Sequence, residues 1–289
     1  MPYLYLISSV FLSASSSLFG KTFNRRNGTK KDATVFYIYC LMICACIGWA
    51  ILWLTNFSFD ANVLWYSALF SICYIATNIG SINALKHGPV ALTSLMNSLS
   101  LILTTIWGFI FWGSKLTVFV VLGLILVVCA LFLCLYSGKK DEKKVSLKWL
   151  IFVTVAFFGN AGCSIVQRTQ QMVYNGQHGN QLMFFALLIS VVAYSFVYFK
   201  SDRTDSPLML KTSAWIPLCS GSFNLVLNVF VMLMATTTLS PSLIYPVIGV
   251  GALAVVTIFS LVVFKEKMSW RQWTGIGVGA LAVALLSIR

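Results

Sequence analysis

Long apolar runs, separated by short polar segments, fill almost the whole chain. Each run is about 20 residues long, which is the length that crosses the roughly 30 Å hydrocarbon core of a bilayer as a helix. The runs predict ten transmembrane helices, at residues 3–22, 35–55, 62–85, 89–112, 116–137, 147–172, 180–200, 212–235, 241–264 and 269–288. The expected fold is therefore that of an all-α integral membrane protein.

The second half of the chain repeats the layout of the first. A shift of 152 positions places Pro89 on Pro241, Lys115 on Lys267 and Gly123 on Gly275. A charged segment at residues 137–146 separates the halves, with five predicted helices on either side. Because an odd number of helices turns the second half upside down, we expect two inverted five-helix repeats, residues 1–140 and 141–289.

The last predicted hairpin carries a recognisable motif. Pro241 stands near the start of its first helix, the turn reads Phe264-Lys265-Glu266-Lys267-Met268-Ser269, and Trp273-Thr274-Gly275 follows in the second helix. This pattern resembles the C-terminal hairpin of the drug/metabolite transporter superfamily, in particular its EamA-like family. The first hairpin departs from it, because Ser114 occupies the Glu position. The resemblance implies a transporter whose central cavity lies between the first, third, fourth, sixth, eighth and ninth helices.

Composition excludes a soluble chain, because 59% of the residues are hydrophobic and only 9% are charged. The net charge of +13 would favour a nucleic-acid partner in a soluble protein. Here the basic residues fall in short loops, which indicates membrane orientation instead, so we expect a lipid bilayer and no nucleic acid as partner. The eight cysteines all lie in apolar runs and are predicted to be free thiols; neither a metal nor a cofactor is expected.

Uncharged polar side chains follow helical stripes on the same six helices. In lipid such side chains prefer the bundle interior or a wet cavity. We therefore expect a substrate-binding cavity whose uncharged lining residues are Tyr74, Asn78, Asn97, Asn160, Ser164, Gln167, Asn224, Asn228 and Tyr245. The alternative is that each stripe only joins neighbouring helices by hydrogen bonds.

Two cations, Lys21 and Arg168, lie within these stripes and complete the predicted substrate-binding set. A shift of 147 positions places one on the other, so they would be counterparts in the two repeats. Each could be an interfacial anchor whose charge reaches the membrane surface, or a contact for a carboxylate or phosphate of the substrate. Because no acidic residue lies deep in any predicted helix, we expect a neutral, zwitterionic or anionic substrate.

These features favour a secondary transporter that moves a small polar metabolite, such as an amino acid, a nucleoside, a sugar or a related anion, by alternating access. The alternatives are an exporter of hydrophobic or toxic compounds and a non-transporting membrane scaffold or sensor. An enzyme is not expected, because no carboxylate pair, His/Asp cluster or nucleophile–base pair is found and no residue is assigned a catalytic role.

The loops also predict how the chain lies in the membrane. Of its 20 Lys and Arg residues, all but Lys115, Arg168 and Arg289 fall in or beside the loops of one face. The positive-inside rule makes that face cytoplasmic and puts both termini outside, in a multi-pass protein of the plasma (inner) membrane. Gly275 and Gly279 form a GxxxG motif that indicates close helix packing, within one chain or in a homodimer.

Overall fold

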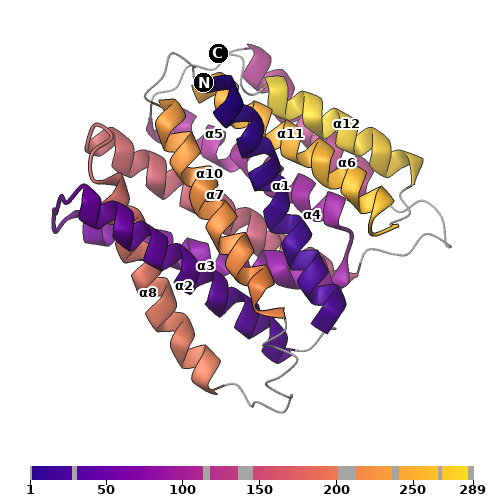
Figure 1. The fold of residues 1–289 in the computed structure, drawn as a ribbon. Helices are drawn as coiled ribbons and strands as arrows, with labels where there is room; N and C mark the ends of the chain where they lie inside the picture. The colour runs from indigo at the N-terminus through magenta and orange to yellow at the C-terminus, as the bar shows by residue number, and fades with distance from the viewer. Residues whose placement is uncertain are drawn as a thin grey trace.

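The computed structural model describes residues 2–27, 31–112, 118–135, 146–200, 213–235, 241–265 and 269–285, which are helical apart from their turns. The helices are α1 (Pro2–Asn27), α2 (Lys31–Thr55), α3 (Val63–His87), α4 (Val90–Leu99), α5 (Leu101–Phe111), α6 (Val118–Leu135), α7 (Leu147–Val173), α8 (Gly179–Lys200), α10 (Trp215–Ala235), α11 (Pro241–Val262) and α12 (Trp270–Leu285) (Figure 1).

Most predicted helices agree with these bounds to within a few residues. Two differences stand out. The first helix continues five residues beyond its predicted end, to Asn27. The helix predicted at residues 89–112 is two helices, α4 and α5, which meet at Ser100. An apolar run alone does not reveal such an interruption, because both halves are equally hydrophobic.

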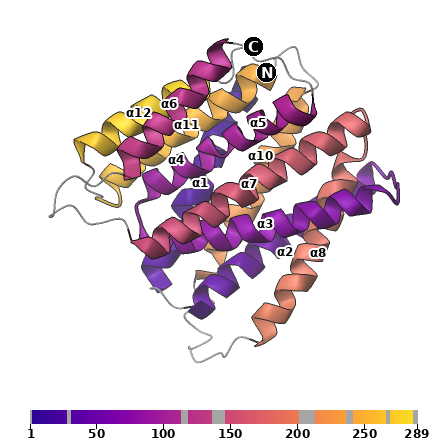
Figure 2. The same cartoon turned by 180° about the vertical axis from the view of Figure 1, so that it is seen from behind.

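Two pairs of helices form opposite ends of the bundle. The α2–α8 pair lies at one end and the α6–α12 pair at the other, in both views (Figures 1 and 2). Between them, α1 packs against α10 and α11, α3 packs against α7 and α8, and α4 packs against α11. The start of α1 and the end of α12 lie on the same side of the molecule (Figure 1). The helices that carry polar stripes are thus the inner ones.

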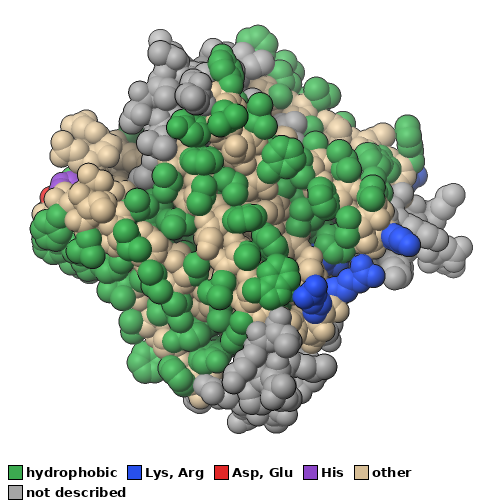
Figure 3. All heavy atoms as spheres, in the orientation of Figure 1, with side chains coloured by type: hydrophobic (Ala, Val, Ile, Leu, Met, Phe, Trp, Pro, Cys, Tyr) green, Lys and Arg blue, Asp and Glu red, His purple; other side chains and the backbone are tan. Residues whose placement is uncertain are grey.

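The outer surface suits a hydrocarbon environment. Five helices in the described part of the chain, namely α1, α2, α3, α7 and α8, are long and apolar enough to cross a membrane. Large apolar side chains point outward from them, including Trp65 (77% exposed) and Phe196 (75% exposed). Figure 3 shows hydrophobic side chains spread over one whole face. Such exposure is typical of lipid-facing surfaces and rare at this scale in soluble proteins.

The tightest helix crossing joins α3 to α7. A Cβ atom built on Gly80 would lie 2.6 Å from the backbone nitrogen of Ala156, and one built on Gly159 would lie 2.8 Å from the backbone nitrogen of Thr77. Only glycine lets two backbones approach so closely. Gly279 of the predicted GxxxG motif faces a side chain instead, because its Cβ would lie 2.6 Å from Cδ1 of Leu95 in the same chain.

One face of the bundle, at which the ends of several helices meet, collects most of the described basic residues, and we call it the basic face. It includes the end of α1, the α3–α4 turn and the starts of α7 and α10. Two contacts of α1 connect these segments: Lys21 donates to the Gly88 carbonyl, and Arg26 stacks on the Trp215 ring. Figure 3 shows Lys and Arg side chains along this edge. The opposite face includes the α2–α3 and α7–α8 connections, where Gln181 hydrogen-bonds to the backbone of Asp60.

Candidate functional site

The junction between α4 and α5 is the centre of the candidate site. Ser100 keeps helical dihedral angles (φ −59°, ψ −21°), but its amide donates to the Asn97 carbonyl, three residues back, at 3.3 Å. The Leu103 amide then donates to the Ser100 carbonyl at 3.1 Å. This tightened turn replaces the regular i→i−4 pattern, which is a common origin of a local helix distortion.

Four polar side chains from three inner helices meet at this point. Asn160 of α7 donates through Nδ2 to Ser100 Oγ (2.7 Å) and to the Asn97 carbonyl (3.1 Å). The Ser100 hydroxyl donates to the same carbonyl at 2.6 Å, and Asn97 Nδ2 donates to Ser81 Oγ of α3 at 3.3 Å. We call Ser81, Asn97, Ser100 and Asn160 the junction cluster. It connects α3, the α4–α5 junction and α7.

The junction has unused hydrogen-bonding capacity. Within the described residues, Asn97 Oδ1 and Thr104 Oγ1 are buried and have no hydrogen-bond partner. A buried acceptor without a partner costs about 1–3 kcal/mol, so a donor that reached it would be favoured. Because the acceptors are neutral, the arrangement can bind N–H and O–H groups of a polar solute.

The polar stripe of α7 continues from the cluster toward the opposite face. Ser164, one turn beyond Asn160, donates to the Asn160 carbonyl at 3.1 Å. Gln167 is half-buried and Arg168 is exposed, and α7 ends soon after at Val173. The stripe therefore provides uncharged polar groups near the cluster and one cation near the end of the helix.

Other predicted site residues bond mainly within their own helices. On α3, Asn78 Nδ2 donates to the Tyr74 carbonyl at 2.9 Å, and the Tyr74 ring packs among hydrophobic side chains. On α10, Asn228 Nδ2 donates to both the carbonyl and Oδ1 of Asn224, each at 2.8 Å. Tyr245 lies in α11, and its side chain is outside the described residues. Among the described predicted residues, the hydrogen bond from Asn160 to the Asn97 carbonyl joins two different helices. The bonds of Ser164, Asn78 and Asn228 each stay within one helix.

Lys21 is held at the basic face. Its ammonium group donates to the carbonyls of Leu85 (3.2 Å) and Gly88 (3.0 Å), at the end of α3. These are among the carbonyls that a helix leaves without an intrahelical partner, and they carry partial negative charge. In this conformation the Lys21 ammonium therefore joins α1 to α3.

Sequence reasoning did not single out Ser100 or Trp149. The Trp149 side chain is fully buried, donates through Nε1 to Thr93 Oγ1 at 3.0 Å, and lies so close to Gly88 that a Cβ there would overlap the indole. A serine inside an apolar run was the available signal for Ser100. The only signal for Trp149 was a tryptophan near the start of a helix, where lipid-interface anchors are also common.

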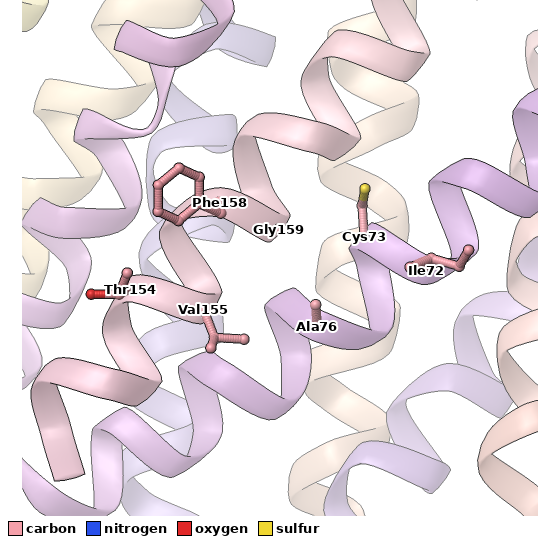
Figure 4. Close-up of a pocket in the computed structure, with 7 residues that line it drawn as sticks. All are labelled: Ile72, Cys73, Ala76, Thr154, Val155, Phe158 and Gly159. Carbon is pink, nitrogen blue, oxygen red and sulfur yellow. The ribbon is translucent and has the colours of Figure 1, made fainter.

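Two apolar grooves lie outside the junction cluster. One, with a volume of about 370 Å³, runs along the α3–α7 crossing and is lined by Ile72, Cys73, Ala76, Thr154, Val155, Phe158 and Gly159 (Figure 4). The other is formed by Val192, Ser195, Phe196 and Phe199 on α8. Because Ile72, Phe158 and Phe196 are strongly exposed, both grooves belong to the outer apolar surface.

The helical bundle with an apolar exterior and inner polar stripes indicates an integral membrane protein. Residues 1–136 match the model of the EamA-like transporter family. This N-terminal part of the chain is therefore similar to that family, which is part of the drug/metabolite transporter superfamily.

The fold has a counterpart among solved structures. A crystal structure, described only as that of a protein, aligns with 96% of this chain and 96% of its own, at 12% sequence identity and a TM-score of 0.59. At this identity the likeness concerns the fold alone. No curated protein sequence matches the chain.

Proposed function

We propose that the protein is a secondary transporter that moves a small polar metabolite across the membrane by alternating access. The observation that carries the proposal is the junction cluster, in which Asn160 binds a distorted helix junction between inner, membrane-spanning helices. Polar groups at an interrupted membrane helix are costly in lipid and are typical of transport sites. No catalytic residue, cofactor or metal is part of the proposal.

The proposed architecture is ten transmembrane helices in two inverted repeats, residues 1–140 and 141–289. The packing supports it, because the α3–α7 and α3–α8 pairs have counterparts in the α10–α1 and α10–α2 pairs. Side chains agree as well. Ser71 and Ser190 bind through their hydroxyls at 2.8 Å, and Cys44 lies 3.3 Å from Ser222. Cys44 and Ser190 are 146 positions apart, and Ser71 and Ser222 are 151 apart, as expected for equivalent pairs.

The substrate is proposed to bind between the inner helices. Asn97, Asn160 and Ser164 would contact it first, because they surround the junction with its unpaired acceptors. The residues proposed to complete the cavity are Tyr74, Asn78, Gln167, Asn224, Asn228 and Tyr245. Arg168 would draw in the negative group of an acidic substrate, while Lys21 could do so only after leaving the carbonyls that it now binds.

We further propose that the basic face is cytoplasmic and that the protein resides in the plasma (inner) membrane with both termini outside. The described basic residues support this orientation, because Arg25, Arg26, Lys148, Lys265 and Arg271 are all exposed at the basic face. Cytoplasmic loops of membrane proteins carry an excess of Lys and Arg.

A counterflow screen in proteoliposomes tests the function. Purified protein is reconstituted with pools of unlabelled amino acids, nucleosides, sugars or their phosphates inside, and uptake of the matching labelled compound is measured. The proposal expects transient accumulation of a neutral, zwitterionic or anionic compound. Accumulation of hydrophobic or cationic compounds alone would support a toxic-compound exporter, and no accumulation of any class would support a scaffold or sensor.

A further inference from the structure

The end of α3 and the start of α7 form a fixed corner at the basic face. The His87 ring of α3 stacks on the Phe152 ring of α7, with centroids 6.0 Å apart and 11° between the ring planes. The next residue, Gly88, lies directly against the indole of the buried Trp149, which donates a hydrogen bond to Thr93 of α4. These contacts fix the positions of the side chains around the corner.

Positive charge gathers at this corner. Lys148 precedes the buried Trp149 on α7, and its own side chain is exposed. Both Lys148 and Lys86 lie close enough to His87 for their charges to act on its imidazole. An anion at this point would be attracted by both ammonium groups, and the imidazole could donate a hydrogen bond to it.

An exposed apolar strip leads from Lys148 along α7. Ile151, Val155 and Phe158 follow Lys148 at intervals of three and four residues, which places all four on one side of the helix. The exposed fractions of these three apolar side chains are 55%, 39% and 58%. At about 1.5 Å per residue, Phe158 lies roughly 15 Å along the helix axis from Lys148, and this is about half of the roughly 30 Å hydrocarbon core. The strip therefore spans the depth of one leaflet.

The far part of this strip is one wall of the apolar groove at the α3–α7 crossing. Val155 and Phe158 line the groove on the α7 side, Ile72 and Ala76 line it on the α3 side, and its volume is about 370 Å³ (Figure 4). The exposed walls Ile72 and Phe158 face the membrane, so hydrocarbon chains of lipids can enter the groove. A charged corner and an apolar groove thus lie at the two ends of one strip.

We propose that the corner and the groove together bind one anionic phospholipid. The lipid phosphate contacts Lys148 and His87, and one acyl chain passes along Ile151 into the groove. Charge complementarity favours an anionic lipid over a zwitterionic one, because the headgroup cation of a zwitterionic lipid is repelled by the same ammonium groups. Basic pockets between membrane helices are known to bind anionic headgroups in this way. The inference does not depend on the proposed transport function.

Native mass spectrometry of the purified, delipidated full chain tests the proposal. The protein in a non-ionic detergent is titrated with phosphatidylglycerol or with phosphatidylcholine that carries the same acyl chains. The parent protein should bind one phosphatidylglycerol about tenfold more tightly than it binds phosphatidylcholine. Since no transported substrate is present, the result stands whether or not counterflow is observed.

The Lys148→Gln variant tests the charged corner. It should weaken phosphatidylglycerol binding by about fivefold, which corresponds to about 1 kcal/mol, and leave phosphatidylcholine binding unchanged. Lys148→Arg keeps the charge and should bind like the parent. Arg25→Gln is the matched control, because it removes an exposed cation from another helix of the basic face and should have no comparable effect.

The Val155→Trp variant tests the groove. The indole should displace part of the acyl chain and weaken phosphatidylglycerol binding by about fourfold for each methylene group that leaves the groove. Val192→Trp makes the same change in the other apolar groove, on α8, and should bind like the parent. Both valines are partly exposed, and melting in lipid-free detergent checks the fold of each variant. If Lys148→Gln or Val155→Trp does not fold, Lys148→Ala or Val155→Phe replaces it.

Three results would overturn the proposal. Equal affinity of the parent for the two lipids would mean that the groove takes any boundary lipid. Equal losses in Lys148→Gln and Arg25→Gln would mean that the attraction is spread over the whole basic face. Glycerol phosphate, a headgroup without acyl chains, is the third probe: if it binds as tightly as the lipid, depends on Lys148 and is insensitive to Val155→Trp, the corner binds a soluble anion instead.

Discussion

Asn160 of α7 donates a 2.7 Å hydrogen bond to Ser100, the residue at which α4 gives way to α5. The two residues lie in different halves of the chain. The distorted turn at Ser100 is therefore stabilised by a side chain from the other half of the chain. Any motion of α7 relative to the α4–α5 junction must change this bond.

The Ser100 hydroxyl is predicted to contribute to stability through this contact. Ser100→Ala should lower the free energy of unfolding by about 1 kcal/mol, because Asn160 loses an acceptor. Ser15→Ala is the matched control, since within the described part of the chain the Ser15 hydroxyl donates only to the Leu12 carbonyl of its own helix. Thermal unfolding of the purified Ser100→Ala and Ser15→Ala variants measures the loss of stability in each. Equal melting temperatures for the two variants would contradict the assigned role of Ser100.

The α3–α7 crossing should not tolerate even a methyl group. Gly80→Ala should cost about 1–3 kcal/mol, because the new Cβ would meet backbone atoms that cannot move away easily. Gly277→Ala has open space around its Cβ and should be neutral or stabilise α12 by up to about 1 kcal/mol. Melting curves in one detergent compare the pair. A Gly80→Ala protein as stable as Gly277→Ala would show that the backbones are not this close.

Trp149 is predicted to be a structural anchor of the α3–α4 turn. Trp149→Ala removes a fully buried side chain together with its bond to Thr93 and should cost about 3–5 kcal/mol. Trp270→Ala provides the control, because that side chain is 80% exposed. Yield of folded protein by gel filtration, followed by melting, distinguishes the variants. Similar losses for both would mean that Trp149 is only an interfacial residue.

Hydropathy predicted the helix ranges well because lipid forces every spanning segment to satisfy its own backbone, whatever its neighbours. The interruption at Ser100 could not be predicted in this way, since it depends on a hydrogen bond from Asn160, about 60 residues away in the chain. That Lys21 and Arg168 are counterparts in two repeats stays a prediction of the repeat alignment.

The environment of the Lys21 side chain could not be predicted from the sequence, for a related reason. An anchor at the lipid interface and a cation bound to helix carbonyls have the same local pattern. Only the packing of α1 against the end of α3 shows which carbonyls the ammonium meets. Asn97 and Asn160, which the polar stripes single out, do form a hydrogen bond, because polar stripes in lipid turn toward each other. Their role in binding a substrate stays a prediction.

Orientation in the membrane gives a further prediction. With native cysteines removed, Arg25→Cys and Asn56→Cys place single thiols at exposed positions of the basic and the opposite face. In intact cells, a membrane-impermeant maleimide should label Asn56→Cys, whereas Arg25→Cys should react only after permeabilisation, because the positive-inside rule makes the basic face cytoplasmic. The reverse labelling pattern would contradict this orientation and place the basic face outside the cell.

Counterflow by the Asn160→Leu variant tests the central claim, that the junction cluster serves transport, most directly. Leu is close to Asn in size and cannot hydrogen-bond to Ser100 or to a polar solute, so uptake of the substrate found in the screen should fall by about tenfold or more. The control is Asn180→Leu, which removes a hydrogen bond from the Asn180 side chain to the Leu52 carbonyl elsewhere and should transport like the parent. Asn160→Leu proteoliposomes that accumulate the substrate at the parent rate would contradict the account.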